Sequence, residues 1–360
     1  MKTYNKIFNS KILYIFFIIL SLNIFFFSTT DLKAKPFNIE NIEISKPFEL
    51  NFEKNKVINN GFRKAFNELI LLIVKSTDQD KFKTIKLNEI KSMINSFSIK
   101  EEKFVNDVYF VNLGVSFDKK KIFEYLEKKN IFPLIPKNKK FLFVPIMIDE
   151  KKQELLIFSE NKIFSQWNNN LKSHHLIEYI LPAEDLEDIR ILKDKYEFIE
   201  QYDFKEITNK YDLKESIIAL IFKNNNDLRI LSRITIKDEV KLKNQLFKNI
   251  NINDDIQIKD VINELKMNYE DFWKDSNMIN TSIRLILTIK MNNLDNTKIS
   301  KFERNLSNED LVYDYKISKF NKDYTFYKII FNGTPSEFLN SMKEYNYRFD
   351  TQNKIWSLDE

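Results

Sequence analysis

The densest group of chemically useful side chains in this sequence is acidic. Glu184, Asp185, Glu187 and Asp188 follow a predicted strand over residues 176–181, a position at which many α/β proteins place their sites. Such carboxylates could hold a hard cation or act in acid–base catalysis. They equally suit the first turn of a helix, where acidic groups accept from free amides and oppose the helix dipole. We favour this structural interpretation because no further ligand is visible in the sequence, and a metal site is the alternative.

Other residues that commonly perform catalysis are scarce. His174 and His175, the two histidines, are adjacent in a polar loop, and no cysteine can complete a metal site with them, so we interpret both as surface residues. Gly61, Gly114 and Gly333 are too few and too scattered for a phosphate-binding loop, so the P-loop and the dinucleotide fingerprint are absent. The sequence therefore predicts no catalytic residue and no cofactor.

A third group is aromatic. Tyr269, Phe272 and Trp273 lie at helical spacing within a predicted helix over residues 258–273. They could bind a sugar or a peptide, but aromatic residues at this spacing more often belong to a core. We favour the core interpretation.

The first residues of the chain have the order of a secretory signal. Lysines precede an almost unbroken apolar run from Ile12 to Phe27, and a polar stretch follows. At about 1.5 Å per residue the run spans roughly 24 Å, which is short of the roughly 30 Å hydrocarbon core. We therefore predict a signal peptide over residues 1–34, cleaved after Ala34, and a periplasmic protein. Because Leu32 stands where a small residue is preferred, the alternative is a retained inner-membrane anchor with the body facing the periplasm.

The charge balance argues against nucleic acid as a partner. Removing residues 1–34 takes away four lysines and one aspartate and leaves 53 basic and 51 acidic side chains. Their signs alternate along the chain, so no one-signed surface is expected to attract phosphates. The absence of cysteine excludes disulfides, so the core alone must stabilise the fold.

Hydrophobic periodicity predicts an N-terminal α/β domain over residues 35–136. Apolar residues recur at helical spacing over residues 57–74, a second helix is predicted over residues 87–97, and residues 111–117 alternate as a half-buried strand. Asp118 then stands at the N-cap position of another helix.

A central three-layer α/β domain is predicted over residues 137–276. It begins with Phe141–Ile148, an almost continuous apolar run typical of a strand buried on both faces. Strands and helices alternate after it, which indicates helices on both sides of a sheet.

The C-terminal domain is predicted over residues 277–360 with the order β-α-β-β-α-β, which is ferredoxin-like. Thr334 and Glu337 form a capping box at the start of its second helix, with proline at the first helical position. The fold class is therefore α/β and α+β in a multi-domain chain.

Strand alternation in this last domain predicts a docking patch on the sheet face opposite the helices. That face should be polar, but Ile286, Phe326 and Ile330 fall on it where the two central strands meet. The preceding domain of the same chain or an outside partner should cover these residues, and the first is favoured.

Four short stretches resemble a known group of proteins. They are Gly61–Phe66, Val115–Asp118, the predicted strand that contains Pro145, and Leu181-Pro182 with Asp185–Asp188, and they resemble an uncharacterised family of exported proteobacterial proteins over roughly residues 57–236. The resemblance implies an envelope location and a multi-domain α/β body. It assigns no catalytic residue.

Two functions fit these observations. The favoured one is a non-catalytic binding or scaffold protein of the cell envelope, with an envelope protein as partner and membrane contact only through an uncleaved N-terminal segment. The alternative is a metal-assisted hydrolase or sugar-active enzyme that uses the acidic group from Glu184 to Asp188.

Overall fold

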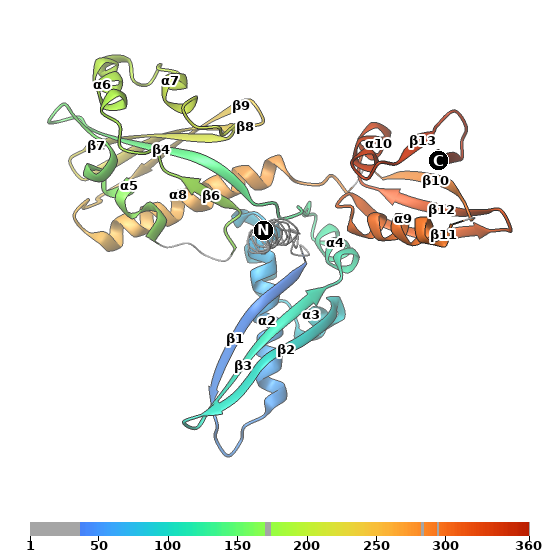
Figure 1. Ribbon diagram of the computed structural model, residues 1–360. Helices are drawn as coiled ribbons and strands as arrows, with labels where there is room; N and C mark the ends of the chain where they lie inside the picture. Colours follow the sequence, from blue (N-terminus) through green and yellow to red (C-terminus); the bar gives the residue numbers. More distant parts are fainter. Residues whose placement is uncertain (1–36, 170–173, 282–283, 294, 360) are drawn as a thin grey trace, which may run out of the picture. The chain divides into compact units, whose positions relative to one another are not determined.

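The computed structural model describes residues 37–169, 174–281, 284–293 and 295–359 (Figure 1). The predicted signal segment at residues 1–34 lies outside the described residues. Within them, no helix combines the length and the apolar character needed to cross a membrane. Residues 39–360 form one unit whose described part contains three sheets, with mixed or antiparallel pairing and helices between the strands. The chain is therefore an α+β protein.

The first sheet has the strand order β1-β3-β2 and packs against a long helix, α2. Phe66 and Leu69 of this helix are buried, and the Phe66 ring lies 6.2 Å from that of Phe117 in the sheet. Asp118 caps the next helix, as predicted, by accepting from the backbone N–H of Lys121. The elements are β1 (Asn38–Pro47), α2 (Lys54–Ile73), the 3-10 helix η1 (Ser76–Phe82), α3 (Leu87–Met93), β2 (Ile94–Val105), β3 (Val108–Phe117) and α4 (Lys119–Lys128).

The second predicted helix is shorter than the periodicity indicated. It ends at Met93, and Ile94 begins β2 by pairing with Phe117 across the ladder to β3. Asn95 and Ser96 are weak helix formers, so the ladder with β3 determines the conformation there.

The second sheet has the order β5-β4-β7-β8-β9, and β6 also pairs with β4. Strand β4 pairs parallel with β6 and β7, whereas β7-β8 and β8-β9 are antiparallel. The elements are β4 (Lys139–Asp149), β5 (Glu154–Leu156), η2 (Phe158–Glu160), α5 (Lys162–Gln166), η3 (Trp167–Asn169), β6 (Ile177–Ile180), α6 (Leu186–Asp194), η4 (Tyr196–Phe198), α7 (Lys205–Thr208), β7 (Ser216–Asn224), β8 (Asp227–Ile236), β9 (Glu239–Phe247) and α8 (Asp255–Ser276).

Strand β4 is buried on both faces, as its continuous apolar run predicted. On one face the Phe143 ring stacks on Trp167 at 3.8 Å and lies near Tyr269 of α8. On the other face Val144 shares a core cluster with Leu192 of α6 and Ile207 of α7. Helices therefore pack on both faces of this sheet (Figure 1).

The third sheet has the order β11-β12-β10-β14-β13. Its helices α9 and α10 bury Phe302 and Phe338 against Ile289, Tyr327 and other inward side chains of β10 and β12. The return strand predicted at the C-terminus is two strands, of which β14 pairs parallel with β10 and antiparallel with β13. The elements are β10 (Leu285–Asn292), α9 (Asn296–Asn308), β11 (Val312–Phe320), β12 (Tyr324–Phe331), α10 (Pro335–Glu344), β13 (Arg348–Asp350) and β14 (Trp356–Asp359).

Candidate functional site

The acidic group at the start of α6 behaves as a helix terminus. Asp185 is the N-cap residue, and its carboxylate accepts from the backbone N–H of Glu187 at 2.8 Å. Asp188 in the first turn is buried. Glu184 is exposed and lies outside this arrangement.

A lysine from a later segment is inserted among these carboxylates. Lys210 Nζ lies 2.8 Å from Asp185 Oδ2, 2.6 Å from Asp188 Oδ1 and 3.6 Å from Glu187 Oε2. The pKa of the Asp185 carboxyl is lowered. The hydrogen bond from Lys210 is the larger cause, and the hydrogen bond from the Glu187 amide is the second. The pKa of Lys210 is raised, first by its hydrogen bond to Asp185 and second by its hydrogen bond to Asp188. The lysine therefore stays charged. The structure thus brings three of the four predicted residues together around an ammonium group.

No cluster of three or more metal-ligating side chains occurs in the part of the chain that the structure describes. His174 Nδ1 lies 3.7 Å from Glu68 Oε2, and its ring meets that of His175 edge to face at 5.2 Å. Both histidines are half-buried, and Glu68, the neighbour of His174, belongs to α2.

The aromatic group of α8 is largely core. Tyr269 is fully buried, and its hydroxyl lies 2.7 Å from Ser232 Oγ. Trp273 donates from Nε1 to the Lys137 carbonyl at 2.8 Å and packs on Phe141. Phe272 is half-buried. For Tyr269 and Trp273 the core interpretation is confirmed.

Helix α8 also carries a row of buried charges that the sequence interpretation missed. Lys266 donates to the Trp167 carbonyl at 2.6 Å, and the Glu270 carboxylate accepts from the amide of Ile177 at 2.9 Å. Lys274 donates to the carbonyls of Leu71 and Val74 at the end of α2. Burial raises the pKa of Glu270 and lowers that of Lys274, with each opposite charge acting against the shift. In the sequence of this helix, charged residues recur at every fourth position next to aromatic residues, and this pattern could have indicated the buried row.

A further lysine, the half-buried Lys119 of α4, donates to the backbone that follows α9. Lys119 Nζ donates to the backbone carbonyls of Glu309, Asp310 and Val312 at 3.2, 2.6 and 3.1 Å. These carbonyls belong to the segment that leaves α9 and enters β11. Burial lowers the pKa of Lys119 to about 8, and Asp310 and Glu309 oppose that shift.

The predicted docking patch lies on the outer face of the third sheet. Ile286 and Ile330 are directly opposite one another across the β10-β12 ladder, and Ile286 is 59% exposed. Phe326 is half-buried and lies opposite Lys290, and the Lys319 ammonium lies 5.5 Å from its ring centroid. The structure therefore places one isoleucine pair together and Phe326 further along the ladder.

Polar side chains beside the isoleucine pair contact α4. Arg284 Nη2 donates to both carboxylate oxygens of Glu127 at 2.7 and 2.8 Å, and Lys120 donates to Asp314 at 2.7 Å. Asp314 is the ladder partner of Ile330 on β11. Ion pairs to helix α4 of the same chain therefore lie on either side of the docking patch, and the Ile286 side chain is still exposed.

An exposed aromatic group at the turn between β2 and β3 was also missed. The Phe48 ring packs edge-on against Phe104 at 4.8 Å, and each ring is about half exposed, at 53% and 51%. The Phe48 amide donates to the Asp107 carbonyl of the turn at 2.8 Å, which holds the two segments together. Phe48 and Phe104 are more than fifty positions apart in the sequence, so local sequence patterns could not predict that they are in contact.

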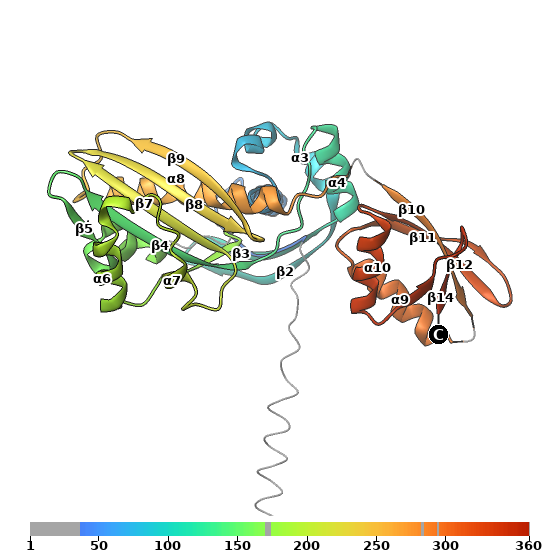
Figure 2. The same cartoon turned by 90° about the horizontal axis from the view of Figure 1, so that it is seen from above.

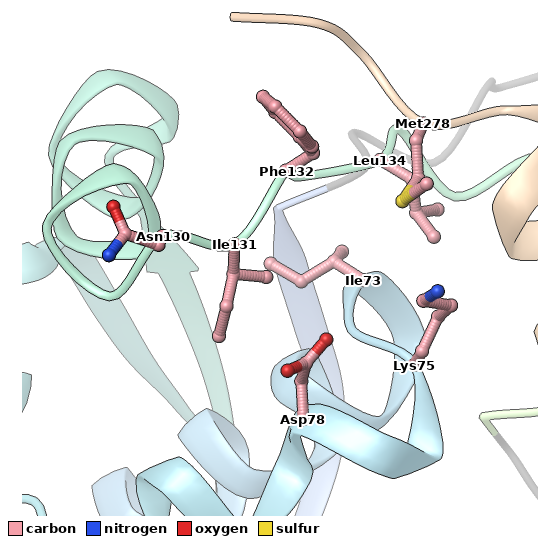
Figure 3. Close-up of a pocket in the computed structure, with 8 residues that line it drawn as sticks. All are labelled: Ile73, Lys75, Asp78, Asn130, Ile131, Phe132, Leu134 and Met278. Atoms are coloured by element: carbon pink, nitrogen blue, oxygen red, sulfur yellow. The ribbon is translucent and has the colours of Figure 1, made fainter.

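A small cavity of about 120 Å³ lies between the end of α2 and residues 130–134 (Figure 3). Its two charged side chains are already paired, Lys75 with Asp275 at 2.8 Å and Asp78 with Lys81 at 2.6 Å. Ligand pockets usually measure roughly 300 to 1,000 Å³. We assign no ligand to this cavity.

No family model matches this chain, and no curated protein matches it. Function must therefore be argued from the geometry.

Proposed function

We propose that this protein is an exported, non-catalytic binding or scaffold component of the cell envelope. The observation that carries the proposal is the exposed Ile286 side chain, paired with Ile330 on the outer face of the third sheet. The flanking charges Arg284 and Asp314 are already engaged by α4. What is left for a partner is therefore an apolar contact rather than an ionic one.

The same proposal assigns the third sheet to a variant of the ferredoxin-like class. Its support is the order β14-β10-β12-β11 and the packing of α9 and α10 against one face. The added strand β13 and the parallel β10-β14 pair are the departures from the simple order.

The alternative function, a metal-assisted hydrolase or sugar-active enzyme, gains no support from the acidic group. Lys210 neutralises part of its charge and occupies the space between the carboxylates. A hydrolytic metal needs several free ligands and an open coordination position.

The docking surface can be tested in the full-length chain by Ile286→Asp, with Ile256→Asp as a matched control. Ile256 is 73% exposed on α8, so both changes place a charge at an exposed isoleucine. Chemical cross-linking in the native envelope should join the unmodified chain and the control to the same partner, and Ile286→Asp should lose it. Equal cross-linking by all three chains, with equal thermal stability, would contradict the proposal.

Export has its own test. A reporter enzyme fused after residue 40 should be active only outside the cytoplasm, because the lysines and the apolar run precede that point. Activity inside the cytoplasm would overturn the proposed location.

A further inference from the structure

Strand β9 is the open edge of the second sheet. It pairs with β8 in an unbroken antiparallel register from Leu228↔Phe247 to Ile236↔Glu239. It is last in the strand order, and among the described residues it pairs with no other strand (Figure 2). A regular edge strand presents a row of free backbone N–H and C=O groups that can accept a further strand.

One face of this edge is mostly apolar. Val240, Leu242 and Leu246 are exposed at 61%, 64% and 58%, with the exposed Asn244 between the two leucines. Because side chains alternate along a strand, all three point to the same face. An added strand with apolar residues at alternate positions would extend this face and cover them.

The other face of the edge has a net positive charge. It carries the half-buried Lys241 and Lys243, with Glu239 at the start of the strand, and within the described ranges neither lysine has an ion pair or a hydrogen bond. Gln245, next on this face, donates weakly to Glu264 of α8 at 3.4 Å. Two lysines on one face of an edge are thus available to an acidic partner.

We propose that β9 binds, by strand addition, an extended segment of a partner protein in which acidic residues alternate with apolar ones. The alternation puts the acidic side chains beside Lys241 and Lys243 and the apolar ones beside Val240, Leu242 and Leu246. Backbone hydrogen bonds supply affinity in this mode of recognition, and alternate side chains supply specificity.

Charge disfavours the other occupants. Pairing with β9 of a second copy would gather four lysines and only two glutamates on one face, and this excess of like charge across a ladder is less favourable than pairing with an acidic segment. The chain's own residues 1–36 carry five lysines and one aspartate, so they repel the same edge. The inference is independent of the proposed docking surface, because it rests on a different sheet.

The test measures binding of fluorescent peptides to the full-length chain. The probe is a capped nine-residue peptide of alternating valine and glutamate, matched in length to β9. The controls are a valine–lysine peptide with the same alternation and a peptide with the same valines and glutamates in two blocks. Only the alternating acidic peptide should bind, and added salt should weaken it.

Charge reversal locates the site. Lys241→Glu with Lys243→Glu should weaken binding by about tenfold or more, because two attractive pairs become repulsive. Lys298→Glu with Lys301→Glu, on exposed positions of α9, should have no effect. If the reversed chain unfolds, Lys241→Gln with Lys243→Gln removes the charges alone and should still weaken binding.

Three results would overturn the inference. Equal binding of the block peptide would show general charge attraction, and unchanged binding by both β9 variants would place the site elsewhere. A dimer in analytical ultracentrifugation that Leu242→Asp converts to a monomer would show that a second copy occupies the edge.

Discussion

Lys210 Nζ lies 2.6 Å from Asp188 Oδ1, although 22 positions separate the two residues in the sequence. Asp188 is buried, and its other oxygen, Oδ2, has no hydrogen-bond partner. The lysine therefore supplies the counter-charge that lies beside this buried carboxyl group.

Replacing Lys210 with Met should destabilise the fold because it leaves Asp188 buried without a counter-charge. Urea unfolding should show a larger loss than for Lys205→Met, whose ammonium is mostly exposed and lies 3.5 Å from Asp203. Adding Asp188→Asn to the Lys210 variant should recover part of the loss. Equal midpoints for the native and Lys210→Met chains would refute this role.

Divalent cations should not stabilise the native chain through the acidic group, since Lys210 already occupies it. The thermal midpoint should be the same with calcium, magnesium or manganese as with EDTA. A rise in midpoint that Asp185→Asn with Asp188→Asn abolishes would instead establish a metal site.

Lys274→Met should cost about 3 kcal/mol of unfolding free energy, since breaking a buried charge network leaves its other members unpaired. The carbonyls of Leu71 and Val74 would lose their donor, and Glu270 would lose its neighbouring cation. Lys259→Met on the exposed side of the same helix is the control, and chemical unfolding is the measurement. A cost no greater than that of the control would show that the buried network contributes nothing.

Lys119 should make stability depend on pH. Burial lowers its pKa from 10.5 to about 8 in the folded chain, so between these values the unfolded chain binds more protons. The unfolding free energy of the native chain, relative to Lys119→Met, should therefore rise with pH by up to about 1.4 kcal/mol per unit in that window. Lys120→Met is the control, because its hydrogen bond to Asp314 raises the pKa of Lys120. A flat difference across the window would contradict the prediction.

Thr334→Ala should cost about 1 kcal/mol by removing the N-cap of α10. Thr334 Oγ1 accepts from the Glu337 amide, and the Glu337 carboxylate accepts from the Thr334 amide at 2.7 Å. The pKa of Glu337 is lowered, first by the hydrogen bond from the Thr334 amide and second by that from the Thr334 hydroxyl. The stabilisation that the Glu337 carboxylate provides is therefore fully present above the ordinary glutamate pKa, and it is lost as the pH falls through the lowered pKa. Ser336→Ala, one position before Glu337, should leave the unfolding free energy nearly unchanged.

Local signals predicted the third sheet well. Leu287, Ile289, Tyr327 and Ile329 alternate with outward residues because helices cover only one face, and the capping box involves neighbouring residues. The strand β9 was missed, since its apolar residues face solvent and so do not mark a buried surface. Strand β2 was not predicted, because its first residues were assigned to a helix and the run Lys100–Lys103 has no apolar residue that would mark a strand.

The candidate site was predictable only in part. The spacing of Asp185 and Glu187 identified a helix terminus, and the structure has one there. Lys210 could not be assigned to it, because nothing local links a loop lysine to carboxylates 22 and 25 positions earlier. Tertiary packing alone decides that contact.

The contact at the end of α2 has a consequence for how the chain folds while it is being synthesised. Its last carbonyls, those of Leu71 and Val74, receive their donor from Lys274, which is 203 and 200 positions later. At the fastest usual rate of synthesis, about 20 residues per second, roughly ten seconds separate the two segments. During that interval water must hydrate these carbonyls, and α2 has no permanent partner at its end. A chain interrupted before residue 274 would keep this helix end open, whatever the state of the first sheet.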